Sequence, residues 1–191
     1  MNLVVAITGA SGSLYAARLL SCLGEAPEID HVYVVFSSHA REVALCERGS
    51  DYVLPAKCSG HDDLSMQVPF VSGSSKVDAC VVVPCSMGTL GRIAHGYSDS
   101  VITRTADVFL KERRQLILVP RETPWNLIQA RNVVTVMEAG ALVLPAIPSF
   151  YGRPETVDQV VDTVVARILD HLKISHELVQ RWRSKDAESR D

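Results

Sequence analysis

Short apolar runs recur along the chain, and they constrain its fold more than any other feature. Runs rich in β-branched residues cover residues 3–7, 31–36, 79–83, 115–119 and 141–144. Continuous apolar runs of this length are typical of strands buried on both faces of a sheet. Stretches with apolar residues at helical spacing lie between most of them. This alternation predicts an α/β fold with a doubly wound parallel sheet, a three-layer α/β/α arrangement of the Rossmann-like or flavodoxin-like type.

The length of the chain, 191 residues, suits one domain that buries its own core. We expect that domain over residues 1–172 and a polar C-terminal tail or arm over residues 173–191. Residues 51–75 are rich in Pro, Gly and Ser, and we expect a long loop there with room for one short element. A second, Pro-rich loop covers residues 145–154, and the apolar stripe of residues 157–172 predicts an amphipathic helix.

Two further helices are expected on either side of the apolar run at residues 115–119. One covers residues 103–114. The other is expected to begin at Pro124 with Thr123 as its cap, because proline suits the first helical position and threonine suits the cap.

Composition and charge exclude several classes of protein. A net charge of −3 gives no reason to expect a nucleic-acid partner. No apolar run approaches the roughly 20 residues that cross a bilayer. The N-terminus lacks the basic region of a signal peptide. We therefore expect a cytoplasmic protein that binds neither nucleic acid nor membrane.

The cysteines and histidines do not form the pattern of a disulfide framework or a metal site. Five cysteines, an odd number, include no CxxC pair, which favours reduced thiols. Six histidines include no HExxH motif and no close Cys/His cluster. No metal site is expected.

Small and polar residues follow the predicted strands and mark the candidate site. They are residues 8–12, Ser37, residues 85–89 and the pair Arg121 and Glu122. Ligands of parallel α/β sheets bind beyond the carboxyl ends of the strands. We therefore expect these segments to converge on one edge of the sheet.

Two of these segments are small-residue turns. Residues 8–12 (TGASG) offer backbone N–H groups at a helix N-terminus, where an anion is stabilised, although a tight turn capped by Ser11 explains them equally well. Residues 85–89 (CSMGT) can donate hydrogen bonds to a heterocycle or phosphate, or can simply cap a helix. Cys85 has no adjacent base, so we interpret it as a packing residue. The position of both turns in a parallel α/β unit favours a nucleotide or flavin ligand.

The charged candidates have both structural and functional interpretations. Lys111, Arg113 and Arg114 close a helix, and its dipole is a sufficient explanation for two of the three. Arg121 and Glu122 together cost desolvation at a strand end unless they meet a ligand or each other, which favours a functional role for Arg121.

For three other residues, spacing alone favours a structural interpretation of Arg167 and Glu47 and leaves Tyr151 even. Arg167 flanks the apolar stripe of its helix, where it can snorkel, pair with Asp170 or reach a phosphate. Tyr151 is either a packed aromatic or a lid residue, and Glu47 at a helix end is ordinarily a solvated side chain.

Taken together, these motifs resemble the UbiX/Pad-type flavin prenyltransferases of the flavoprotein superfamily, formerly called 3-octaprenyl-4-hydroxybenzoate carboxy-lyases or phenylacrylic acid decarboxylases. The matching pieces are TGASG, PCSMGTL, ITRTADVFLKERRQLILVPRETP, SFYGRP and VVARIL. They extend from Thr8 to Trp182 in the family's order and spacing.

The resemblance implies a metal-independent transfer of a dimethylallyl group from dimethylallyl monophosphate to N5 and C6 of reduced FMN. The product, prenylated FMN, is the cofactor of UbiD-type decarboxylases, and the family assembles as homododecamers. By this resemblance the flavin is bound by Gly9, Ala10, Ser11, Ser37, Ser86, Met87, Gly88, Thr89 and Arg121. The donor is held by Lys111, Tyr151 and Arg167, and the catalytic residues are Ser11, Glu47, Arg121 and Glu122.

The chain departs from the family pattern at Ser38, His39, Trp125 and in the short segment of residues 51–71. Rival interpretations are an FMN-dependent cysteine-type decarboxylase, a flavin-binding subunit of a hydroxyarylic acid decarboxylase complex and a flavodoxin-like electron carrier. The sequence leaves open the partner decarboxylase and the choice between monophosphate and diphosphate donors.

Overall fold

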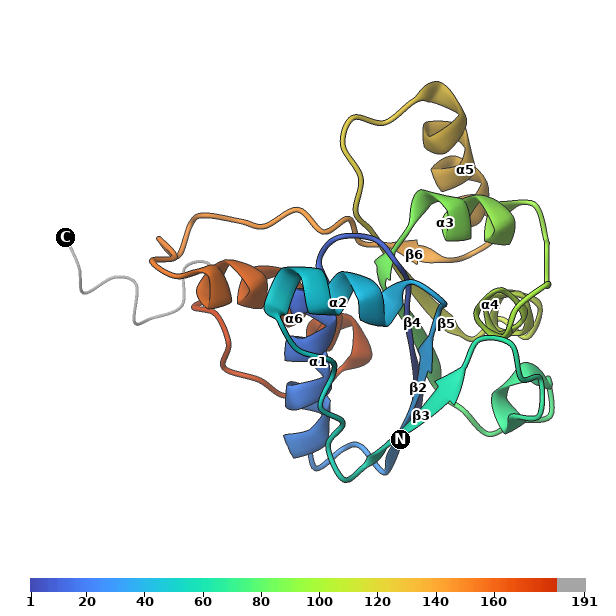
Figure 1. The fold of residues 1–191 in the computed structure, drawn as a ribbon, viewed down its shortest axis with the longest axis horizontal. Coiled ribbons are helices and arrows are strands. Elements are labelled where there is room, and N and C mark those ends of the chain that lie inside the picture. The colour runs from blue at the N-terminus through green and yellow to red at the C-terminus, as the bar shows by residue number, and fades with distance from the viewer. Residues whose placement is uncertain (182–191) are drawn as a thin grey trace. The chain divides into compact units, whose positions relative to one another are not determined.

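The computed structural model describes residues 1–181, and these contain a six-stranded parallel sheet (Figure 1). The strands are β1 (Asn2–Ile7), β2 (His31–Phe36), β3 (Cys58–Asp62), β4 (Ala79–Cys85), β5 (Gln115–Pro120) and β6 (Leu142–Val143). The helices are α1 (Ser13–Glu25), α2 (Ala40–Arg48), α3 (Met87–Ala94), α4 (Val101–Lys111), α5 (Leu127–Glu138) and α6 (Val157–Leu172), with a 3₁₀ turn at Pro69–Val71. The strand order is β3-β2-β1-β4-β5-β6.

The apolar runs form the strands that they predict, and the predicted fold class is confirmed. Every residue of β4 is buried, as expected for a central strand covered on both faces. Within residues 1–146, α1 and α2 lie on one side of the sheet and α3, α4 and α5 on the other (Figure 1). This gives the three layers of a doubly wound domain.

The strand β3 was not predicted as such, because its segment was expected to be a loop with at most one short element. Its sequence, CSGHD, has no apolar run, and its residues are half-buried or exposed. As an edge strand it gains its regular structure from pairing with β2, in which Tyr33 is opposite Ser59 and Val35 is opposite His61. Pairing with a strand distant in sequence leaves no periodic signal in the segment itself.

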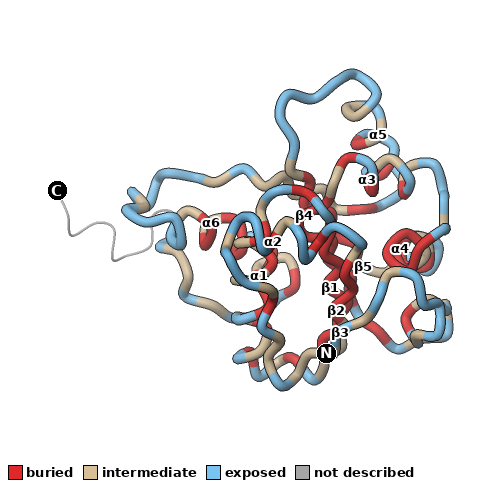
Figure 2. Tube along the Cα trace, viewed as in Figure 1, coloured by how far each residue is buried: buried red, intermediate tan, exposed pale blue. Residues whose placement is uncertain are grey.

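The core lies against both faces of the central strands, where Figure 2 shows buried residues gathered along β1, β4 and β5. On the side of α3 and α4, Phe70, Phe109, Leu90 and Leu116 belong to one buried apolar cluster. Phe70 comes from the segment that follows β3, so this segment contributes to the core although it is polar overall.

The predicted helix boundaries near β5 need correction. The helix α5 begins at Leu127 instead of Pro124, and Asn126 is its cap instead of Thr123. The Asn126 side chain accepts a hydrogen bond from the Gln129 N–H, and the Gln129 side chain accepts one from the Asn126 N–H. This reciprocal pair satisfies two N–H groups at the helix N-terminus, which Thr123 does not do. The helix α4 ends at Lys111, short of the predicted Arg114.

Two compact units divide the chain, residues 1–146 and residues 147–191. In the second unit, α6 starts at the cap residue Thr156, and the apolar stripe predicted for this helix includes Val164 and Ile168, which are buried. The proposed boundary between residues 172 and 173 stays a prediction, and Trp182 with the rest of the predicted tail to residue 191 lies outside the described residues. None of the helices within residues 1–181 has the length and apolar character to span a bilayer.

Three polar side chains, His31, Ser59 and His61, contact one another at the β3 edge of the sheet. The Ser59 hydroxyl lies 2.8 Å from His31 Nε2 and 2.9 Å from His61 Nε2. The two rings also contact Tyr33, and His61 packs against Phe70. Burial, followed by the charge of His31, lowers the pKa of His61.

We expect His61 to make the stability of the protein depend on pH. Its pKa is lower in the folded state than the ordinary value of 6.5, so the unfolded chain binds more protons and stability falls as the pH falls below that value. His61→Gln should therefore flatten the dependence of unfolding free energy on pH, measured by urea unfolding between about pH 7.5 and pH 5.5. The exposed residue His95 provides the control His95→Gln, which should keep the wild-type slope; the same slope in the His61 variant would contradict the interpretation.

Candidate functional site

The site is built where the central strands β1 and β4 end side by side. From β1 the chain winds outward to β2 and β3, and from β4 it winds the other way to β5 and β6. The loops after β1 and β4 therefore diverge and leave a crevice at this point. The Thr8 hydroxyl bridges the two loops: it donates to the Pro84 carbonyl oxygen (2.7 Å) and accepts from the Ser86 N–H (2.8 Å).

The turn after β1 requires glycine at two positions. A Cβ on Gly9 would lie 2.6 Å from His39 Cβ, so the start of α2 packs directly against the turn. Gly12 has a φ of 114°, in the region that favours glycine. The predicted turn is thus present, and His39, one of the departures from the family pattern, forms part of its wall.

Glu47 of α2 reaches the N-terminus of α1. Its carboxylate accepts hydrogen bonds from the Gly12 N–H (3.0 Å) and the Ser13 N–H (2.8 Å). Burial raises the pKa of Glu47, but hydrogen bonds from Ser11, Ser13 and Gly12 together outweigh burial and leave this pKa below its usual value. The N–H groups that the sequence offered to a ligand anion are therefore taken by a protein carboxylate, and Glu47 is more than a solvated side chain.

The turn after β4 forms the cap of α3. The Ser86 side chain accepts a hydrogen bond from the Thr89 N–H (3.2 Å), and the two hydroxyls lie 3.0 Å apart. Met87 is buried, whereas a Cβ on Gly88 would meet nothing within 4 Å. Cys85 is fully buried, and burial raises the pKa of its thiol to about 12, which agrees with a packing role.

Arg121 joins the end of β5 to the turn after β1. Its Nε donates to the Ser11 carbonyl oxygen at 3.0 Å, and its charge also acts on Tyr15, a residue that the sequence did not single out. Glu122 is exposed and accepts a hydrogen bond from the Thr123 N–H. The sequence predicted a desolvation cost for an adjacent Arg and Glu. Because Glu122 is exposed in the described chain, its carboxylate does not bear that cost.

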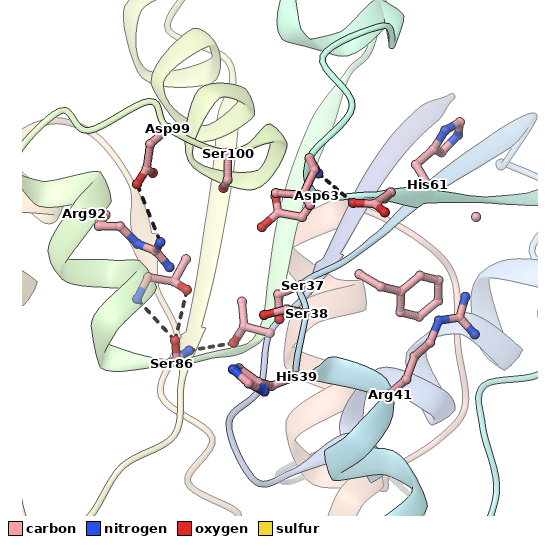
Figure 3. Close-up of a pocket in the computed structure, with 17 residues that line it drawn as sticks. Ser37, Ser38, His39, Arg41, His61, Asp63, Ser86, Arg92, Asp99 and Ser100 are labelled. Carbon is pink, nitrogen blue, oxygen red and sulfur yellow. Dashed lines mark hydrogen bonds and ion pairs between the residues drawn. The ribbon is translucent and has the colours of Figure 1, made fainter.

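A cavity of about 810 Å³ opens at the carboxyl ends of β1, β2 and β3 (Figure 3). It is lined by Thr8, Gly9, Phe36, Ser37, Ser38, His39, Arg41, Gly60, His61, Asp62, Asp63, Leu64, Ser86, Thr89, Arg92, Asp99 and Ser100. Of the predicted flavin residues, four line this cavity: Gly9, Ser37, Ser86 and Thr89. Ala10, Ser11, Met87, Gly88 and Arg121 belong to the same turns and strand end but not to the cavity wall.

Several residues of the cavity wall were not predicted from the sequence. His61, Asp62 and Asp63 come from β3 or directly follow it, and this strand has no apolar signal. Arg92 lies three residues after Thr89 on α3, so helical spacing places both on one side of the helix. This spacing is the sequence signal that could have identified Arg92 as a wall residue.

The predicted donor-binding residues belong to different units: Lys111 is in the first, and Tyr151 and Arg167 are in the second. Lys111 at the end of α4 donates to Glu112 and does not line the cavity. In the second unit Tyr151 is exposed, and Arg167 Nη1 donates to Asp170 Oδ2 at 2.7 Å, one of the pairings that spacing left open. Their joint action on one donor stays a prediction. Residues 1–181 contain no cluster of three or more His, Cys, Asp or Glu side chains suited to a metal ion.

The whole chain is similar to known flavoproteins. The family model described as Flavoprotein matches residues 1–169. "Flavin prenyltransferase UbiX" of Methanocaldococcus jannaschii is 42% identical over 184 residues, which cover 95% of this chain and 98% of the relative.

Two solved structures extend the comparison. A dodecameric FMN-dependent UbiX-like decarboxylase from Escherichia coli O157:H7 has a TM-score of 0.91 at 38% identity, covering 96% of this chain and 100% of its own. AnUbiX (PadA1), solved with FMN and dimethylallyl pyrophosphate, has a TM-score of 0.88 at 37% identity, covering 96% of this chain and 97% of its own.

We expect Glu47→Gln to destabilise the protein and to remove part of its acid sensitivity. The folded pKa of Glu47 is lowered, so its contribution is present above the ordinary value of 4.5 and is lost as the pH falls through the folded pKa. Because the side chain is largely exposed, the loss at pH 7 should be about 1 kcal/mol. Urea unfolding at pH 7 and pH 3.5 measures both effects, with the exposed residue Glu138 providing the control Glu138→Gln. Equal stability of the Glu47 variant and wild type at pH 7 would contradict the capping role.

Proposed function

The chain belongs to the UbiX-type flavin prenyltransferases of the flavoprotein family, and we propose that it transfers a dimethylallyl group from dimethylallyl monophosphate to N5 and C6 of reduced FMN. The observation that carries this proposal is the match to prenyltransferases over 95% of the chain, with the family's turns at the point where the strand order reverses. The decarboxylase and binding-subunit alternatives are not favoured, because no feature of the described site supports them over prenyl transfer.

The residues present fit a flavin nucleotide. The cavity volume lies within the usual range for cofactor sites, and its wall combines the hydroxyls of Ser37, Ser86 and Thr89 with the turn at Gly9. We propose that FMN is held by Gly9, Ala10, Ser11, Ser37, Ser86, Met87, Gly88, Thr89 and Arg121. Reduced FMN, when bound, supplies the nucleophilic N5 and C6 positions that accept the prenyl group.

The occupied helix N-terminus suggests how the flavin is oriented. Because Glu47 already binds the N–H groups at the start of α1, a phosphate dianion would be repelled there. The hydroxyls of Ser37, Ser86 and Thr89 lie on the cavity wall instead. We therefore place the phosphate end of FMN in the cavity and the ring end toward Ser11, Glu47 and Arg121.

At the ring end, charged groups are positioned for proton and charge control. The lowered pKa of Glu47 keeps its carboxylate ionised near neutral pH, so it can accept a hydrogen bond from the Ser11 hydroxyl and orient that hydroxyl beside the flavin ring. Arg121 is fixed through the Ser11 carbonyl oxygen and brings a permanent positive charge to the same turn. Glu122, exposed in the single chain, completes the proposed catalytic set.

The donor phosphate needs cations that act most strongly in the transition state. Cleavage of the allylic C–O bond leaves extra charge on the phosphate, which Lys111 and Arg167 would stabilise, with the Tyr151 hydroxyl as a hydrogen-bond donor. Arg167 is already oriented by Asp170, so a phosphate would meet a guanidinium with donors to spare. This chemistry proceeds without a metal.

The surface of the single chain suggests self-assembly. Leu127, Ile128, Val134 and Met137 on α5 are apolar and exposed. Apolar side chains gathered on one helix indicate a surface that another protein covers. Since the related Escherichia coli protein is dodecameric, we propose a homododecamer, acting in the cytoplasm with a UbiD-type decarboxylase as consumer of its product.

We expect prenylated flavin when the protein is incubated anaerobically with reduced FMN and dimethylallyl monophosphate. Mass spectrometry of the released flavin should show a gain of one C5H8 unit. A parallel reaction with dimethylallyl diphosphate measures the donor preference. Bound but unmodified flavin with both donors would overturn the proposed function.

The site assignment is tested separately with Arg121→Ala and Glu122→Gln. Loss of a charge that stabilises the transition state should lower kcat/KM for prenyl transfer by about 100-fold while the fold remains intact. Arg167→Ala should chiefly raise the KM for the donor. The exposed residue Lys76, which precedes β4 at the other end of the sheet, provides the control Lys76→Ala, which should keep wild-type turnover. Wild-type kinetics in the Arg121 and Glu122 variants would refute their roles.

A further inference from the structure

We propose that Arg92 is a further flavin-binding residue, which pairs with the 5′-phosphate of FMN and makes the site prefer FMN over riboflavin. Neither the motifs nor the family resemblance assigned this residue a role. The inference rests on the proposed function, because it concerns the phosphate end of the same flavin.

The position of Arg92 points to an anion. Figure 3 shows its side chain between Asp99 and Ser86, on the cavity wall. Arg92 lies near the end of α3, and helical side chains lean toward the N-terminus of their own helix. Thr89 lies one turn before Arg92 on the same side of the helix, so the guanidinium shares the cavity wall with the Ser86 and Thr89 hydroxyls.

In the chain without a ligand, Arg92 makes a loose contact with the carboxylate of Asp99. Arg92 Nη1 lies 3.8 Å from Asp99 Oδ2, too far for a hydrogen bond, and the Arg92 side chain is 46% exposed. The other Asp99 oxygen accepts from the Thr103 hydroxyl at 3.3 Å. Asp63 also acts on Arg92, but its carboxylate accepts the Ile102 N–H at the start of α4. Arg92 thus keeps guanidinium donors available to a ligand.

Two other basic side chains on this wall have closer partners. Arg41 pairs with Asp51, and its guanidinium lies 4.1 Å from the centre of the Phe36 ring. His39 Nδ1 lies 3.2 Å from Glu42 Oε2. Arg92 is therefore the cation of the wall that is best placed to change partner.

The same wall also carries negative charge that a phosphate must overcome. Asp62, Asp63 and Asp99 line the cavity together with the hydroxyls of Ser37, Ser86 and Thr89. A phosphate dianion bound by these hydroxyls would be repelled by the carboxylates unless a cation stood between them. Figure 3 shows Arg92 between Asp99 and Ser86, and a guanidinium can bind two phosphate oxygens at once. On binding, Arg92 exchanges its loose contact with Asp99 for the phosphate, and no covalent bond changes.

The test compares FMN with riboflavin, which lacks the phosphate, by titration of the full-length protein with each oxidised flavin. Arg92→Met removes the charge and keeps most of the apolar stem, Arg92→Lys keeps the charge without the planar fork, and Lys76→Met, at the other end of the sheet, is the control. We expect Arg92→Met to raise the Kd for FMN about tenfold or more and to change the Kd for riboflavin less than about twofold. Arg92→Lys should recover part of the FMN affinity, and the control should match wild type.

Salt dependence provides a measurement that needs no variant. FMN affinity of the wild-type protein should fall as KCl rises from about 50 to 500 mM, while riboflavin affinity stays constant. Equal weakening of both flavins in Arg92→Met, unchanged FMN affinity, or a flat salt response would overturn the role of Arg92. If Arg92→Met does not fold, Arg92→Lys and the salt series decide the outcome. Prenyl transfer is measured independently: normal transfer with no effect of Arg92 rejects this inference alone, and FMN selectivity without transfer rejects the proposed function alone.

Discussion

The hydrogen bonds of the Thr8 hydroxyl hold together the two loops on which the rest of the site depends. Thr8 is 2% exposed, and its hydroxyl is shared between the Pro84 carbonyl oxygen and the Ser86 N–H. These bonds join the end of β1 to the end of β4, where the parallel sheet changes its winding direction. The turn at Gly9 and the cap at Ser86 are thereby set at a constant separation. A buried hydroxyl that both donates and accepts is well suited to this link.

Charge around this link is distributed between two helix N-termini. At α1 the carboxylate of Glu47 satisfies the Gly12 and Ser13 N–H groups, so that end is already neutralised from within the protein. At α3 the cap is the uncharged Ser86, and a guanidinium lies nearby. One end of the crevice is therefore prepared for proton control and the other for an anion. This asymmetry gives a physical reason for a flavin nucleotide to bind in one orientation.

Most departures from the family pattern lie on the cavity wall, although Trp125 does not. Ser38 and His39 line the wall, His39 packs over Gly9, and the short segment after α2 supplies His61 and Asp62 of β3 and Asp63 directly after it. In the proposed orientation of FMN, these titratable groups and Arg92 lie at the phosphate end, and Arg121 and Glu47 lie at the ring end.

The sequence by itself determined the alternation of strands and helices, the three-layer fold class and the small-residue turns at Gly9 and Ser86, because apolar periodicity and turn chemistry are local properties. It also placed Arg121 directly after the end of β5. Only the tertiary structure decided that Glu47 occupies the start of α1, that β3 forms a strand and that Arg92 faces the hydroxyl-lined cavity. Each of these depends on contacts between segments far apart in the chain, or on a wall assembled from several such segments. Such contacts leave no periodic pattern in the sequence of either segment, so they can be recognised only in the folded structure.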